Sequence, residues 1–152
     1  MEIKLSKDTK LSVIFDAIAD GKKCTLIIED NTKPATDFWR GVKHFQKSEF
    51  ACKCSGRYCN GFPAEPSEIL VLFLDDLREY AQAPVVVSSG VRCKKHNASV
   101  GGVGNSHHMS GRAADFAICG QSSQTTINLI ETLGYKPIEI YAIDDTYVHV
   151  AF

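Results

Sequence analysis

Residues 106–119 read SHHMSGRAADFAIC, a loop with two histidines followed by a short apolar segment that contains one aspartate. The apolar part, 112–119, lies between Gly111 and Gly120 and is predicted to be a β-strand. Because side chains alternate between the faces of a strand, Asp115 shares a face with the alanines at 113 and 117. An unpaired carboxylate on an apolar face is costly, so Asp115 needs a partner, and a metal ion would serve.

The final segment, 146–152 (TYVHVAF), alternates in the same way and is also predicted to be a strand, with His149 opposite an apolar face. His108 stands in the preceding Gly/Ser-rich loop, where its ring can be oriented without straining a regular element. His108, Asp115 and His149 therefore form a candidate zinc site. A catalytic zinc keeps three protein ligands and a water, whose pKa it lowers from about 15.7 to roughly 7. Taken singly, His149 would be read as an ordinary strand histidine and Asp115 as a capping or ion-paired residue. His107 is expected to lie beside His108, or to support a ligand, without binding the metal itself.

Further blocks surround these residues in a fixed order. They are 44–52 (HFQKSEFAC), 74–79 (LDDLRE), 87–93 (VSSGVRC), 97–102 (NASVGG) and the pattern S-x-H-x-x-G-x-A-x-D, filled by Ser106, His108, Gly111, Ala113 and Asp115. Together they resemble the zinc D-Ala-D-Ala carboxypeptidase family of peptidoglycan peptidases, with its phage endolysin and prophage members. The resemblance covers residues 44–152. It implies an α+β fold of the Hedgehog/DD-peptidase type, in which a small antiparallel sheet carries the zinc site and helices pack on one side.

The resemblance also implies a role for each matching position. His108, Asp115 and His149 would hold Zn²⁺. Arg92 would bind a substrate carboxylate or stabilise the tetrahedral oxyanion, because the fixed fork of guanidinium donors suits both tasks. Ser106 would support substrate binding near the metal loop. The alternative, that Arg92 is an ordinary loop arginine, is disfavoured by the turn at 88–90 (SSG), which would hold its side chain in one direction.

The chain departs from this family at two positions near its last strand. Relatives usually carry an acidic general base three residues before the final histidine, where this chain has Thr146. Asp144 and Asp145 directly precede it, and a bulge could bring one of them to the catalytic water, Asp145 first because it is closer. The alternative is that the two aspartates form a hairpin turn. Ala151 is the second departure, since many relatives place an aspartate there.

The expected function is a zinc-dependent peptidase that hydrolyses peptidoglycan stem peptides, as a D-Ala-D-Ala carboxypeptidase or an L-Ala-D-Glu-type endopeptidase. Thr146 and Ala151 favour a different class of function, a non-catalytic zinc-containing module that binds the cell wall or forms part of a phage particle. The expected partner of the peptidase is its peptidoglycan peptide substrate.

Composition excludes several other classes. The chain has 152 residues and a net charge of −1, so the clustered positive charge of nucleic-acid-binding proteins is not expected. It contains no apolar run of about 18 residues that could span a membrane. The first residues lack the apolar core of a secretory signal. We therefore expect synthesis in the cytoplasm and access to the cell wall through a phage holin or on a phage particle.

The predicted organisation is one compact unit with an added front segment. Residues 41–152 form the peptidase-like domain, and 1–40 form an extension of strand, helix and strand whose role the sequence does not assign. Within the domain, the run 66–68 (PSE) is predicted to open a helix that continues to about Ala81, with Pro66 at an early helical position. The apolar residues at 38, 39 and 42 are expected to pack on the domain. The remaining predicted elements are strands at 84–88 and 138–143 and a helix from 122 or 123 to 133.

Six cysteines in a chain without a secretory signal are more typical of thiols or metal ligands than of a disulfide framework. Three of them lie in 52–59 (CKCSGRYC), a spacing that is not that of a zinc finger. A structural zinc or a disulfide staple there would need Cys93 or His96 as a fourth member, and reduced or loosely paired cysteines are the favoured interpretation. Cys24 and Cys119 are expected to be ordinary buried residues.

Overall fold

The chain divides into two units, Met1–Asp37 and Phe38–Phe152, and the computed structural model describes the second of them, residues 38–152. The strands and the helix predicted within 2–29 lie outside the described residues, as does Cys24. The predicted domain boundary at residue 40 therefore stays a prediction.

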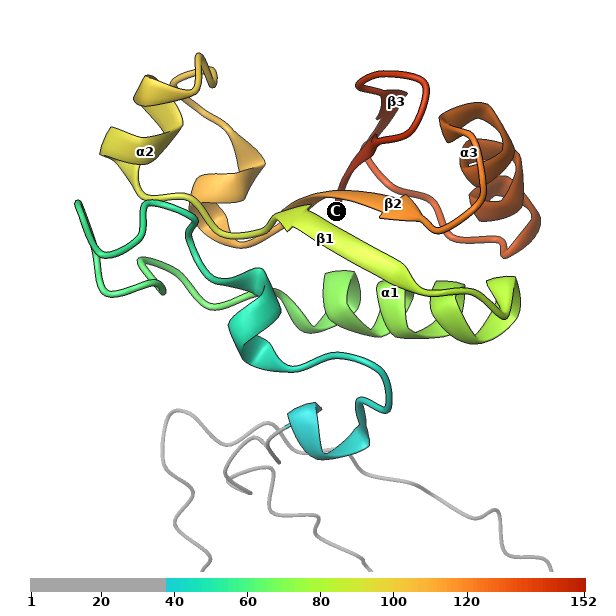
Figure 1. Ribbon diagram of the computed structural model, residues 1–152. Coiled ribbons are helices and arrows are strands. Elements are labelled where there is room, and N and C mark those ends of the chain that lie inside the picture. The colour runs from blue at the N-terminus through green and yellow to red at the C-terminus, as the bar shows by residue number, and fades with distance from the viewer. Residues whose placement is uncertain (1–37) are drawn as a thin grey trace, which may run out of the picture. The chain divides into compact units, whose positions relative to one another are not determined.

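A four-stranded antiparallel sheet lies at the centre of the described unit (Figure 1). Its strands are β1 (Val85–Ser89), β2 (Ala113–Ile118), β3 (Glu139–Ala142) and β4 (Val148–Ala151), in the spatial order β1-β2-β4-β3. β4 follows β3 in sequence but inserts between β2 and β3, so it is an interior strand. This arrangement confirms the predicted α+β class with a small antiparallel sheet.

Helix α1 (Glu68–Ala81) covers one face of the sheet, as Figure 1 shows. The prediction placed Pro66 at an early helical position, but the helix begins at Glu68, because the Ser67 hydroxyl caps it by accepting a hydrogen bond from the backbone N–H of Leu70 at 3.4 Å. It ends at Gln82, whose left-handed φ of 50° stops the helix. Leu70, Phe73, Leu74 and Leu77 supply its buried stripe.

The alternation predicted for β2 and β4 determines which side chains meet α1. Phe116 and Val150 are fully buried on this face. Ile130 of helix α3 (Ser123–Thr132) belongs to the same apolar cluster. The apolar residues at 38, 39 and 42 pack against the same core, as predicted. One continuous apolar core therefore fixes the sheet from one side.

The opposite face of β2 is covered by connecting segments, so all six of its residues are buried. These segments include the 3₁₀-helix η3 (His107–Ser110) and the short helix α2 (Lys94–Ser99), which contact each other. The sequence analysis missed α2, because six polar and small residues carry no apolar period. Cys119 is exposed, which corrects the expectation of burial: β2 ends at Ile118, and Cys119 enters the turn at Gly120. No helix within residues 38–152 has the length and apolar character needed to cross a membrane.

Gly111 closes η3 with a φ of 72°, and a Cβ at this position would lie 2.0 Å from the carbonyl oxygen of Glu65. Gly120 has a similar φ of 79° but open space around it. We expect Gly120→Ala to lower the free energy of unfolding by about 1–2 kcal/mol through backbone strain alone. Gly111→Ala should lower it by a further ~1–3 kcal/mol because the backbone must also move apart. Urea unfolding of the two variants tests this, and equal losses would contradict the predicted clash.

Candidate metal centre

Three buried side chains that are distant in sequence meet on the covered face of β2. The register of the sheet places Asp115 opposite His149, and η3 brings His108 over the same strand. The Oδ1 atom of Asp115 lies 2.7 Å from His149 Nδ1 and 3.2 Å from His108 Nε2. One donor atom from each residue lies within 4.8 Å of the others. The structure thus brings together the three residues that the sequence analysis proposed as metal ligands.

The outer nitrogen of each imidazole has an acceptor of its own. His108 Nδ1 lies 2.7 Å from the carbonyl oxygen of Gly90, and His149 Nε2 lies 3.2 Å from Oε2 of Glu139. An acceptor at one ring nitrogen favours the proton there and leaves the lone pair on the other nitrogen. The other nitrogen of each ring faces the Asp115 carboxylate, where it can donate a hydrogen bond to Asp115 or, as a lone pair, hold a cation placed between the three groups. Two imidazoles and one carboxylate form the donor set of many catalytic zinc sites, so these residues fit a zinc ion.

Arg92 completes the surroundings of Asp115. Its Nη2 pairs with Oδ2 of Asp115, and its Nε donates to the Ser89 hydroxyl at 2.7 Å. Burial alone would raise the pKa of Asp115. Hydrogen bonds from His108 and His149, together with the positive charge of Arg92, outweigh burial and hold that pKa well below its ordinary value. Asp115 is therefore ionised at neutral pH, as a metal ligand must be.

The three residues lie at a cleft of about 340 Å³. Arg92 and Ser106 both line it, so the two residues assigned to substrate binding are near the proposed ligands, although their roles stay predictions. Four exposed apolar side chains also line the cleft: Val100, Val103, Tyr141 and Ile143. An apolar rim around a polar floor suits a substrate whose backbone is polar and whose side chains are small and apolar.

Asp144 and Asp145 lie in the turn between β3 and β4 and are exposed, and neither lines the cleft. Oδ1 of Asp144 accepts hydrogen bonds from the backbone N–H groups of Thr146 and Tyr147, each at 2.7 Å. The hydrogen bonds from Tyr147 and Thr146 hold the pKa of Asp144 below its ordinary value, which makes it a weaker base. This is the turn that the sequence analysis weighed as the alternative. A base function for either aspartate stays a prediction.

The structure adds an acidic residue that the sequence analysis missed. Glu139 of β3 lines the cleft, with Oε2 near His149 and Oε1 3.6 Å from His107 Nε2. The ring of Tyr141, two residues along the same strand, stacks on His149 with centroids 4.7 Å apart. The sequence does contain a signal for Glu139. Residues 138–143 were predicted to form the strand that precedes the final strand, and a tight turn at 144–145 pairs these two strands. Alternate residues of β3 therefore lie beside His149.

The family model of peptidase M15 matches residues 43–151 of this chain. The chain belongs to the peptidase M15 family. The match confirms the resemblance seen over residues 44–152, and it identifies the described unit as a hydrolase of the metallopeptidase class that acts on peptides. A comparison with curated proteins gives no match.

Substituting one of the three proposed ligands tests the candidate metal centre of this M15 peptidase directly. We expect His108→Ala to lose one equivalent of bound zinc relative to the wild type, because the two remaining donors cannot hold the ion tightly. His44→Ala is the matched control, since His44 pairs with Glu79 on another surface. Metal analysis after gel filtration gives the stoichiometry. Wild-type zinc content in His108→Ala would exclude this ligand set.

Proposed function

We propose that this M15 peptidase is a zinc-dependent endopeptidase of peptidoglycan stem peptides. The observation that carries the proposal is the meeting of His108, Asp115 and His149 at a cleft, within the part of the chain that matches the family. A zinc ion held by these three residues would supply Lewis acidity, which activates water and polarises a peptide carbonyl.

The charges in the cleft favour an endopeptidase over a carboxypeptidase. A carboxypeptidase must neutralise the free carboxylate at the end of its substrate. Among the described residues that line the cleft, Arg92 is the one arginine or lysine, and its guanidinium already pairs with Asp115 and Ser89. Its side chain is only 15% exposed. A bond inside the stem peptide, away from the terminal carboxylate of a D-Ala-D-Ala pair, therefore suits this cleft better.

Glu139 is our candidate for proton transfer. Apart from Asp115, it is the one carboxylate among the described residues that line the cleft, and its side chain is 45% exposed. In the proposed reaction it accepts a proton from the attacking water and returns it to the departing amine nitrogen, so that one water is consumed for each peptide bond broken. Arg92 and Tyr141 both line the cleft within which the peptide would lie.

Incubation with purified peptidoglycan tests the proposed function. We expect zinc-loaded protein to release fragments whose masses show cleavage within the stem peptide, and a chelator to abolish this release. Mass spectrometry of the soluble fragments identifies the bond. Loss of a single terminal D-alanine would instead identify a carboxypeptidase. Intact muropeptides from several wall types would overturn the peptidase proposal and support the non-catalytic, wall-binding alternative.

Substitution of the acidic residues tests the proton-transfer step. We expect Glu139→Gln to lower turnover by ~10²–10⁴-fold with zinc content unchanged, because the variant cannot accept a proton. Asp145→Asn, on the exposed turn, should leave turnover near that of the wild type. Steady-state kinetics on a released fragment, with metal analysis, measures both.

Three other outcomes are informative. A large loss in Asp145→Asn alone would favour the base that the sequence analysis placed first. The same result in Asp144→Asn would favour its neighbour. A ~10–100-fold loss of zinc affinity in Glu139→Gln would mean that Glu139 orients His149 and does not transfer the proton.

A further inference from the structure

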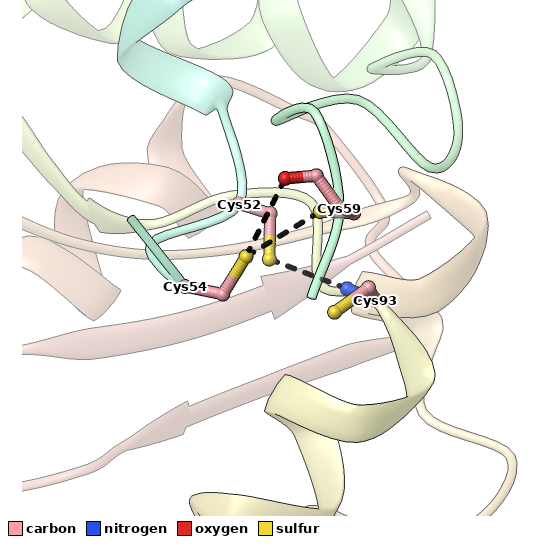
Figure 2. A group of neighbouring side chains, drawn as sticks. All are labelled: Cys52, Cys54, Cys59 and Cys93. Atoms are coloured by element: carbon pink, nitrogen blue, oxygen red, sulfur yellow. Dashed lines mark hydrogen bonds between the residues drawn. The ribbon is translucent and has the colours of Figure 1, made fainter. Parts of the chain in front are cut away.

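Four cysteine side chains converge at a second place in the described unit (Figure 2). Cys52, Cys54 and Cys59 come from the segment 51–67, which follows the 3₁₀-helix η2 (Lys47–Phe50). Cys93 comes from the distant loop that precedes α2. All four are free thiols, and Cys52, Cys54 and Cys93 are each 6–7% exposed. Cys93, and not His96, is thus the fourth member of the group.

The sulfur atoms have the spacing of a metal site. All four lie within 4.8 Å of one another, and the Sγ atoms of Cys54 and Cys59 are 3.5 Å apart. A tetrahedral zinc with zinc–sulfur bonds of about 2.3 Å holds its sulfurs about 3.8 Å apart. Backbone N–H groups also point at two of the sulfurs: Cys93 N donates to Cys52 Sγ and His96 N to Cys93 Sγ, both at 3.4 Å. Such donors stabilise thiolates.

The end of the segment 51–67 is anchored, since the backbone N–H of Ser67 donates to the carbonyl oxygen of Gly111 at 2.8 Å, but the part that carries Cys54 and Cys59 has little regular structure to hold it. It contains no helix or strand, and its residues 55–58 are all exposed. The apolar cluster beneath it consists of the four cysteines and is separate from the main core. Ordering a backbone opposes folding by about 1–2 kcal/mol per residue, more than four small side chains can offset by burial. A closed metal site supplies folding free energy directly.

We propose that Cys52, Cys54, Cys59 and Cys93 bind a structural zinc ion that fastens the segment 51–67 to the loop carrying Arg92. Four thiolate ligands leave no position for water, so the site is closed and not catalytic. Four basic residues lie within two positions of these cysteines in the sequence: Lys53, Arg57, Lys94 and Lys95. Their positive charges offset the negative charge of four thiolates on one dication.

The location gives this zinc ion a positioning role for the metal centre. Cys93 directly follows Arg92, and the backbone N–H of Val91 donates to the carbonyl of Phe50 at 2.8 Å. A Cβ on Gly90 would lie 2.4 Å from that same carbonyl oxygen, so the two segments touch backbone to backbone. The Gly90 carbonyl in turn is the acceptor for His108 Nδ1. Fixing Cys52 to Cys93 therefore fixes both Arg92 and an outer contact of His108.

X-ray absorption at the zinc edge tests the proposal on the full chain, independently of any peptidase activity. We expect the wild-type protein, purified under reducing conditions with zinc, to show a sulfur shell at about 2.3 Å. His149→Ala should retain one zinc per chain with four sulfur neighbours. A wild-type spectrum with only nitrogen and oxygen neighbours, or iron in place of zinc, would overturn the assignment.

Single cysteine variants provide the matched comparison. Cys93→Ser should lose one equivalent of zinc, and limited proteolysis should then cut within 51–67. Cys119→Ser, at an exposed cysteine outside the group, should keep wild-type zinc content and resistance. If Cys93→Ser fails to fold, alkylation of the wild type decides: the four thiols should react only after a chelator is added. A disulfide between any two of them, or reaction at full rate without chelator, would overturn the proposal.

Discussion

Asp115 is a buried carboxylate that the surrounding structure is arranged to neutralise. Arg92 pairs with one of its oxygens, while His149 and His108 approach the other. Each partner arrives on a different element: the Arg92 loop after β1, strand β4 and the 3₁₀-helix η3. Leaving such a charge unpaired in the interior would cost several kcal/mol, so none of these elements can move far without destabilising the fold. The constraints that hold the sheet together and those that assemble the metal centre are therefore largely the same.

The two faces of the sheet contact different parts of the protein. One face packs on α1 and α3 through fully buried apolar side chains such as Phe116 and Val150. The other carries Asp115 and His149 and is covered by irregular segments, which leave a cleft. The apolar core beneath the sheet holds the proposed ligands in a fixed geometry. The loops on the other face can contact a substrate without moving them.

Much of this was predictable from the sequence, for physical reasons that also explain the failures. The alternation of side chains in 113–118 and 148–151 indicated the faces of Asp115 and His149, and the run 66–68 (PSE) located the start of α1 to within two residues. Glu139 was missed because the hairpin formed by β3, the turn at 144–145 and β4 was predicted without its register, and the register decides which residues of β3 share a face with His149. The register also decided which acidic residues line the cleft, and it left Asp144 as a turn residue. The choice of Cys93 over His96 likewise depended on how two distant loops meet.

The position of β4 in the sheet has one more consequence. Because it lies between β2 and β3, His149 is held by two neighbours, and it cannot leave the centre unless hydrogen bonds on both sides of the strand break together. A metal ion held by His149 and Asp115 would bridge β4 to β2 by a route independent of those hydrogen bonds. Because such an ion would bind the folded arrangement and not the opened one, it would stabilise the folded arrangement by mass action. Loading of the proposed centre would therefore make the interior strand harder to separate from its neighbour.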